Sequence, residues 1–176
     1  MFDGEIKVTG KHASYIKFLA AKTTQLNKSI PCAGIFKRYI DVYIAGATIG
    51  LVKKLKSQTD NSIQDSATLF ADAVIGEQEK LKVLYRIMHL IDNQSLTADE
   101  RIDLAFRYDA EDTYVKKGME IFNSYARGGI EWLYEEITSN NASTNDDYFE
   151  NITEMIKNFA QDYAESFVND DRTVTI

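Results

Sequence analysis

Proline is almost absent from this chain, and that scarcity constrains the fold more than any other feature of the sequence. Pro31 is the single proline among 176 residues. A proline inside a helix removes one backbone hydrogen bond and clashes with the preceding turn, so long helices exclude it. With 44% hydrophobic and 27% charged residues, the composition is that of a globular protein. We therefore expect an all-α fold built from long helices.

The spacing of the apolar residues supports this expectation and places the helices along the chain. Thr97 and Glu100 form a capping box, which marks the start of one of them. Five or six helices with short connections are typical of a compact helical bundle, and a chain of this length usually forms one domain, here residues 1–176. Helices are predicted over residues 11–27, 32–57, 63–92, 98–109 and 113–138, followed by a last helix that begins at residue 146.

The two ends of the chain are expected to differ from the helices between them. Residues 1–10 form an N-terminal arm, in which Ile6 and Val8 alternate with Lys7 and so permit a short extended segment. Residues 168–176 are polar and are expected to form a flexible tail.

The helices predicted over residues 32–57 and 63–92 would supply much of the core. The first is apolar on every side at its centre, which is typical of a buried helix. The second carries apolar residues at alternating intervals of four and three. This pattern is a heptad seam from Ile63 to Ile91, and it has one interruption, at Glu77.

Glu77 is the most informative polar residue, because a carboxylate in an apolar seam is costly to desolvate unless it is paired. It could belong to a satisfied polar layer that fixes the helix register, or it could face water where the seam turns outward. It could also be a buried base or ligand with a raised pKa. We favour the polar layer and predict that Arg38 or Arg127 is its partner.

Arg38 and Asp41 lie three residues apart and form a second candidate cluster. The simpler interpretation is a local ion pair at the rim of the core. The alternative is that both side chains share a polar pocket with Glu77. Together with Arg127, these residues are then the candidates for the site of a small enzyme.

Two pairs of glycines interrupt predicted helices, Gly46 with Gly50 and Gly128 with Gly129. A glycine inside a helix costs about 1 kcal/mol relative to alanine. A close approach of two backbones often offsets that cost. We predict that the two pairs face each other, so that the helices carrying them cross at short distance. The alternative is a hinge, or a loop that admits a ligand next to Arg127.

The net charge of −7 is distributed unevenly along the chain. Residues 1–56 hold ten basic and three acidic residues, giving +7, whereas residues 57–176 hold ten basic and twenty-four acidic residues, giving −14. Either the first third forms a basic surface for nucleic acid, or it packs against the acidic remainder and the two charges largely cancel. We favour the second interpretation, because the lysines are scattered and the whole chain is acidic.

If a nucleic-acid surface exists, it would use the basic residues of the first third. A helix that opens with Lys11 and His12 could also hold an anion at its N-terminus, although a solvated cap is the simpler interpretation. The candidates for binding nucleic acid are Lys11, Lys17, Lys22, Lys37, Arg38, Lys53 and Lys54.

Several motifs of catalysis and cofactor binding are absent from the sequence. It has no phosphate-binding glycine loop, no nucleophile elbow and no His-Glu-x-x-His motif. With two histidines and one cysteine, we predict neither a metal site nor a cofactor. The lone Cys32 gives no sign of an oxidising compartment, the N-terminus has no apolar core of signal-peptide length, and no apolar run reaches the length of a membrane span. We therefore expect a cytoplasmic protein that does not bind membranes.

The first functional hypothesis is a non-catalytic interaction or accessory protein that binds a protein partner or associates with itself. It follows from the missing catalytic motifs and from helices with broad apolar faces. Trp132, beside the apolar face of its predicted helix, would anchor such an interface. The alternatives are an accessory protein that binds nucleic acid and a small enzyme with a polar site.

Overall fold

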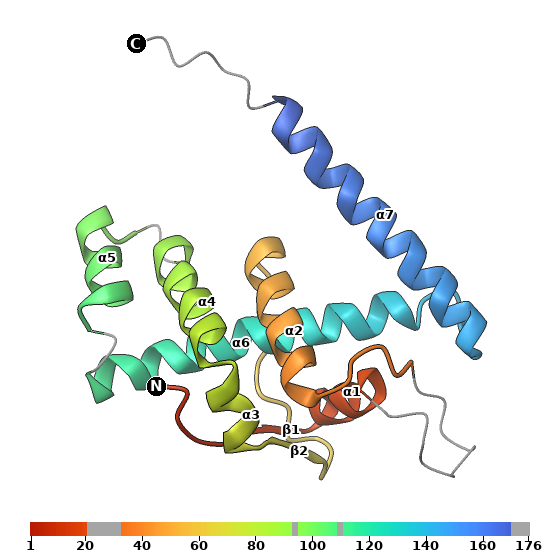
Figure 1. The fold of residues 1–176 in the computed structure, drawn as a ribbon, viewed down its shortest axis with the longest axis horizontal. Coiled ribbons are helices and arrows are strands. Elements are labelled where there is room, and N and C mark those ends of the chain that lie inside the picture. Colours follow the sequence, from red (N-terminus) through yellow and green to blue (C-terminus); the bar gives the residue numbers. More distant parts are fainter. Residues whose placement is uncertain (21–32, 93–94, 109–110, 170–176) are drawn as a thin grey trace.

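The structure, a computed structural model, describes residues 1–20, 33–92, 95–108 and 111–169. As the sequence predicts, it is mostly helical (Figure 1). In addition, two short strands form a small sheet. The described residues form seven helices rather than the predicted five or six. The elements in chain order are β1 (Ile6–Thr9), α1 (Lys11–Leu19), α2 (Tyr39–Lys53), β2 (Ser66–Leu69), α3 (Ala71–Gly76), α4 (Gln78–Ile91), α5 (Ala98–Phe106), α6 (Asp112–Ile137) and α7 (Asn145–Asn169).

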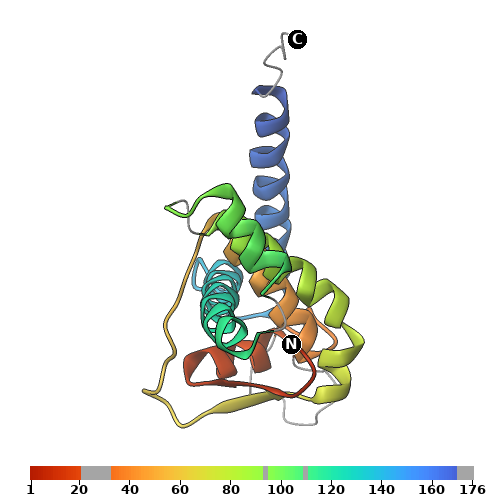
Figure 2. The same ribbon diagram turned by 90° about the vertical axis from the view of Figure 1, so that its left-hand side faces the viewer.

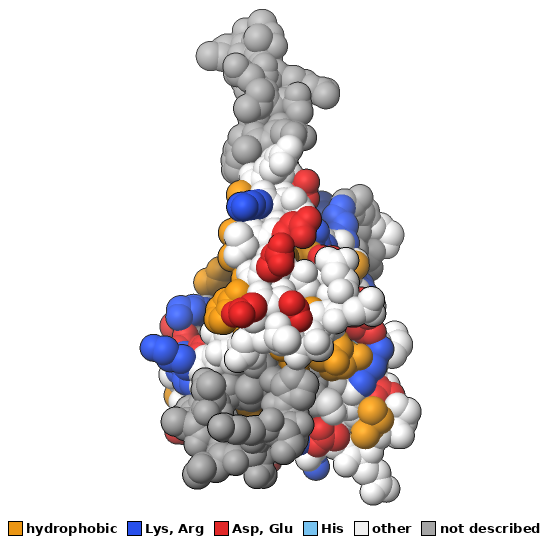
Figure 3. Space-filling model, turned by 90° about the vertical axis from the view of Figure 1, so that its right-hand side faces the viewer, with side chains coloured by type: hydrophobic (Ala, Val, Ile, Leu, Met, Phe, Trp, Pro, Cys, Tyr) orange, Lys and Arg blue, Asp and Glu red, His pale blue; other side chains and the backbone are white. Residues whose placement is uncertain are grey.

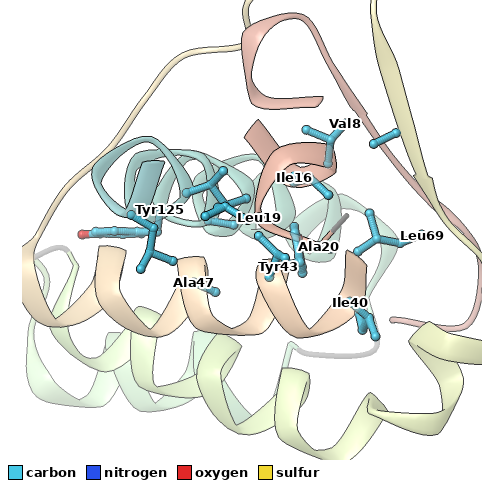
Figure 4. Packing of buried hydrophobic residues seen from close by; sticks show 14 of the residues in the cluster. Val8, Ile16, Leu19, Ala20, Ile40, Tyr43, Ala47, Leu69 and Tyr125 are labelled. Carbon is cyan, nitrogen blue, oxygen red and sulfur yellow. The ribbon is translucent and has the colours of Figure 1, made fainter. Parts of the chain in front are cut away.

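Helix α6 runs through the middle of the molecule, and other elements pack around it. Helices α2 and α4 cross one side of α6, while α1 and the sheet lie below it (Figures 1 and 2). The core fills the space between these elements. Figure 4 shows Ile40, Tyr43 and Ala47 on one face of α2, with Leu19 of α1 and Tyr125 of α6 beside them. All five side chains are buried.

The glycine pairs of α2 and α6 lie against each other. A Cβ atom at Gly129 would overlap the carbonyl oxygen of Gly46 and would lie 2.7 Å from the backbone nitrogen of Gly50. A Cβ atom at Gly128 would lie 2.5 Å from the carbonyl oxygen of Leu55, just beyond α2. The two backbones can therefore cross closely only because these positions lack side chains.

Helix α2 is shorter than the helix predicted over residues 32–57. Arg38 is extended (φ −135°), and the segment before it bonds to α1 instead, with the N–H of Phe36 donating to the carbonyl of Leu19. The helix ends because Lys54 adopts the left-handed conformation, from which its N–H caps the last turn. The helix predicted over 11–27 is described as far as α1, which ends at Leu19. Residues 21–32, with Pro31 and Cys32, lie outside the described residues.

The single long helix predicted over residues 63–92 is wrong. Its first part forms β2, which pairs with β1 in antiparallel register, Ile6 opposite Leu69 and Thr9 opposite Ser66. The remainder is divided into α3 and α4 at Glu77, whose backbone is not helical (φ −109°, ψ 11°).

The heptad seam therefore does not exist over its full length. Ile63 and Phe70, two of its members, are 52% and 67% exposed. In β2 the side chains alternate, so Ala67 and Leu69 face the core instead. From Val74 onward the predicted seam residues of α3 and α4 are largely buried, because this part is helical.

The C-terminal half agrees better with the sequence. The capping box is confirmed. The hydroxyl oxygen of Thr97 accepts from the backbone N–H of Glu100, and the carboxylate of Glu100 accepts from the backbone N–H of Thr97. Helix α6 lies within one residue of its predicted range, and α7 begins one residue early. The tail predicted from residue 168 is still helical at Asn169, and residues 170–176 are outside the described residues.

Helix α7 leaves the end of α6 and projects away from the rest of the molecule (Figure 1). Its first turns are anchored. Tyr148 is buried with its ring 5.4 Å from that of Phe18, and the amide of Asn151 donates to the carbonyls of Ile137 and Ser139. None of the described helices is both long enough and apolar enough to cross a membrane.

Candidate functional site

A groove of ≈ 650 Å³ lies where β1, the segment after α2 and one face of α6 meet. Three cationic side chains and one acidic side chain line it, and most of its other residues are polar. The lining residues are Lys7, Val8, Thr9, Lys56, Gln58, Thr59, Glu120, Ile121, Asn123, Ser124 and Arg127.

Arg127 is the half-buried cation of this groove. Its Nε donates to the carbonyl of Ser57 at 2.9 Å, and no carboxylate of the described residues lies within ion-pair distance of it. Burial lowers the pKa of Arg127, because desolvation penalises the charged form. A guanidinium nevertheless stays charged at neutral pH. The groove therefore has a fixed positive charge without a carboxylate partner.

Next to Arg127, across Ser57, lies a polar cluster around the buried His12, here called the buried cluster, which joins α1 to α6. His12 Nε2 lies 3.2 Å from the hydroxyl of Ser57 and 3.4 Å from a carboxylate oxygen of Glu131. Lys11 forms an ion pair with the same carboxylate. Burial favours a higher pKa for Glu131, but the hydrogen bonds from Lys11 and Ser57 outweigh it and lower that pKa.

The cluster resembles a nucleophilic triad in composition but not in geometry. In a triad the acid contacts one imidazole nitrogen and the nucleophile the other. Here Ser57 and Glu131 both contact Nε2 of His12, while Nδ1 is buried without a hydrogen-bond partner. The arrangement links α1 to α6, and it lacks the acid on Nδ1 that orients the imidazole of a triad.

The N-terminus of α1, where the sequence allowed an anion site, is occupied by the protein's own carboxylate. Asp60 accepts from the backbone N–H of Lys11 at 2.7 Å, and this bond, with those from Ser62, lowers its pKa to about 2. Gly10 (φ +66°) makes room for it, since a Cβ there would overlap the backbone of Asp60.

The cluster predicted around Glu77 forms only in part. Arg38 Nη2 lies 2.7 Å from Glu77 and 2.5 Å from Asp41, and Lys80 lies 2.7 Å from Glu77. The structure thus brings Arg38, Asp41 and Glu77 together at the N-terminus of α2. Arg127 is not there; it lies in the groove.

The chemistry of this cluster is that of an ion-pair network. The side chain of Glu77 is 13% exposed, and hydrogen bonds from Lys80 and Arg38 lower its pKa. A general base would need the opposite shift, toward neutrality. The network connects α2 to the junction of α3 and α4.

The candidates for binding nucleic acid that the structure describes lie on α1 and at both ends of α2. Lys11, Lys17 and Arg38 are each paired with carboxylates, those of Glu131, Asp65 and, for Arg38, Asp41 and Glu77. The others are dispersed or not described. Lys37 and Lys54 are exposed, Lys53 lies over an aromatic ring, and Lys22 is outside the described residues.

Trp132 packs against the core and is covered by a lysine. Lys53 Nζ lies 4.6 Å from the centre of its ring and 6.0 Å from that of Phe159 on α7. Lys53 therefore connects Trp132 of α6 with Phe159 of α7.

Helix α7 presents a second candidate surface. Phe149 is 62% exposed and Ile156 is 59% exposed. They lie seven residues apart, on the same face of the helix. Figure 3 shows acidic side chains along α7 with hydrophobic side chains beside them.

Apart from Arg127 in the groove and Lys11 and His12 in the buried cluster, sequence reasoning missed the members of both. Ser57 and Glu131 meet His12 although they lie 45 and 119 residues from it along the chain. No local motif joins such positions. The missing information was the packing of α1 on α6, which brings His12 beside Glu131.

The model of one protein family, described as DNA sulphur modification system-associated protein 4, matches residues 6–171. The match runs from β1 into α7 and so includes the groove, the buried cluster and the exposed residues of α7. No curated protein and no solved structure matches the chain.

Proposed function

The chain belongs to the family of DNA sulphur modification system-associated protein 4, and from this premise we propose that it is a non-catalytic accessory protein of such a system. It acts by binding another protein of that system, and α7 is the element that binds. Trp132, which the sequence suggested as the anchor of an interface, lies beside Lys53, whose ammonium group is also near Phe159 of α7.

The observation that carries this proposal is the exposure of Phe149 and Ile156 on a projecting helix. Large apolar side chains that share one face of a helix, with polar residues beside them, suit a hydrophobic groove of a partner. Complete burial of each side chain would contribute about 1.5–3 kcal/mol to the complex.

The charge of α7 favours a different protein over a second copy of this chain. Residues 145–162 contain five acidic residues and one basic residue, Lys157, and so carry a net charge of −4. A symmetric dimer through α7 would place two such surfaces against each other, and like charges would oppose it. The partner is therefore expected to have an apolar groove with a basic rim.

Phe149→Ser combined with Ile156→Ser tests this proposal. A matched control is Phe70→Ser combined with Ile75→Ser, because these residues are of the same types and are also more than half exposed, but lie outside α7. Each variant is mixed with the individual proteins of a DNA sulphur modification system. Size-exclusion chromatography with light scattering then reports which complexes form.

We expect the wild type and the control to elute as a complex with one of these proteins, and the α7 variant to elute alone. A complex that survives in the α7 variant, or one that is lost in the control, would refute the role of α7. If the chain alone is a dimer that dissociates in the α7 variant, its partner is a second copy and the charge argument is wrong.

A further inference from the structure

We propose that the groove beside α6 binds the phosphate group of a phosphate ester, with Arg127 as its anchor. This site is separate from α7, and the inference does not depend on the protein interaction proposed above. A nucleic-acid strand and a free nucleotide both offer this chemistry, and the experiment distinguishes them.

The first argument is the state of the Arg127 guanidinium. Its Nε is held by the carbonyl of Ser57, which fixes the plane of the group. Its two terminal nitrogens have no hydrogen-bond partner among the described residues. A guanidinium held in this way can donate two parallel hydrogen bonds, which is the geometry that an oxyanion accepts.

The second argument is the local charge. Lys7 and Lys56 line the groove with Arg127, against the single carboxylate of Glu120. Lys56 is partly neutralised by its ion pair with Asp92, whereas Lys7 is exposed and forms no ion pair within the described part of the chain. A cationic groove on a chain with a net charge of −7 attracts anions to this place rather than to the whole surface.

The third argument is an oriented neutral donor. The amide oxygen of Asn123 accepts from the hydroxyl of buried Tyr43 at 2.5 Å. Because this bond uses the amide oxygen, the NH₂ group is the part of the Asn123 side chain that is left to donate hydrogen bonds. The groove thus combines a guanidinium, an ammonium group and an amide donor, a set that suits the oxygens of a phosphate.

The test measures binding of a labelled short DNA duplex, a labelled single strand and, by calorimetry, adenosine diphosphate. The variants are Arg127→Gln and Lys7→Gln, and the control is Arg107→Gln, which removes the same charge from an exposed position outside the groove. Urea unfolding checks the stability of each variant. Lys7→Gln keeps the test decisive if Arg127→Gln is unstable, because Lys7 is exposed.

We expect both groove variants to weaken binding about tenfold at low salt, and Arg107→Gln to leave it unchanged. For the duplex, the slope of log affinity against log salt should fall by about one per removed contact. Weakening with DNA identifies a nucleic-acid backbone as the source of the phosphate, and weakening with adenosine diphosphate alone identifies a nucleotide. Absence of binding to all three probes, or equal binding by the groove variants and the wild type, would overturn the proposal.

Discussion

His12 and His89 are both buried, and each has a ring nitrogen without a hydrogen-bond partner in the described structure. Burial lowers the pKa of both imidazoles, because the charged form loses its hydration. Glu131 near His12 and Asp92 near His89 act in the opposite direction but do not outweigh burial. Both side chains are therefore neutral in the folded protein at pH 7.

These histidines make the stability of the protein depend on pH. The unfolded chain takes up protons near pH 6.5, whereas the folded chain takes them up only at lower pH, so the free energy of unfolding falls as the pH falls. The contribution is complete above the unfolded pKa and is lost as the pH drops toward the lowered folded pKa. Urea unfolding measured at intervals between about pH 7.5 and pH 6 reports this loss.

The control for this prediction is the double variant His12→Gln and His89→Gln. It should be less stable throughout, since both side chains are packed, but its stability should change little across the same interval. A double variant with the full pH dependence of the wild type would show that other groups titrate there.

Among the elements, the crossing of α2 and α6 depends most strictly on the absence of side chains. Gly129→Ala would press a methyl group into the backbone of Gly46 and Gly50, which cannot move aside as a side chain can. We predict a loss of about 3 kcal/mol in the free energy of unfolding, the upper end of the usual cost of overpacking. Urea unfolding of the purified variant measures it.

Gly76→Ala is the matched control for that substitution. No atom lies within 4 Å of the Cβ position there, and the residue ends α3. Alanine should therefore stabilise the protein slightly, by up to about 1 kcal/mol, through the higher helix propensity of alanine and its smaller backbone entropy. Equal losses for both variants would indicate that the close crossing is not the cause.

The sequence predicted those elements whose signals are local. The capping box at Thr97 and the apolar stripes of α6 and α7 lie within single helices, so spacing alone located them. Strand β2 had no such signal. Its apolar residues also fitted a heptad, and only pairing with β1, about sixty residues away in sequence, decides the competition in favour of a strand.

At the scale of the whole molecule, the fold brings basic residues of the first third of the chain next to acidic residues of the remainder. Four basic residues of the first third are paired with acidic residues of the remainder: Lys11 with Glu131, Lys17 with Asp65, Arg38 with Glu77 and Lys56 with Asp92. The cations of the groove come from both parts, Lys7 and Lys56 from the first and Arg127 from the second. The sequence could therefore suggest Arg127 as a candidate but could not predict what surrounds it.

The central claim is that this protein docks onto another protein through α7. Hydrogen–deuterium exchange of the backbone amides, compared between the free chain and its complex, tests it most directly and needs no substitution. We predict slower exchange in residues 146–160 on binding, while the amides that line the groove, such as those of residues 120–127, exchange at an unchanged rate. Unchanged exchange in α7, with protection elsewhere, would contradict the claim.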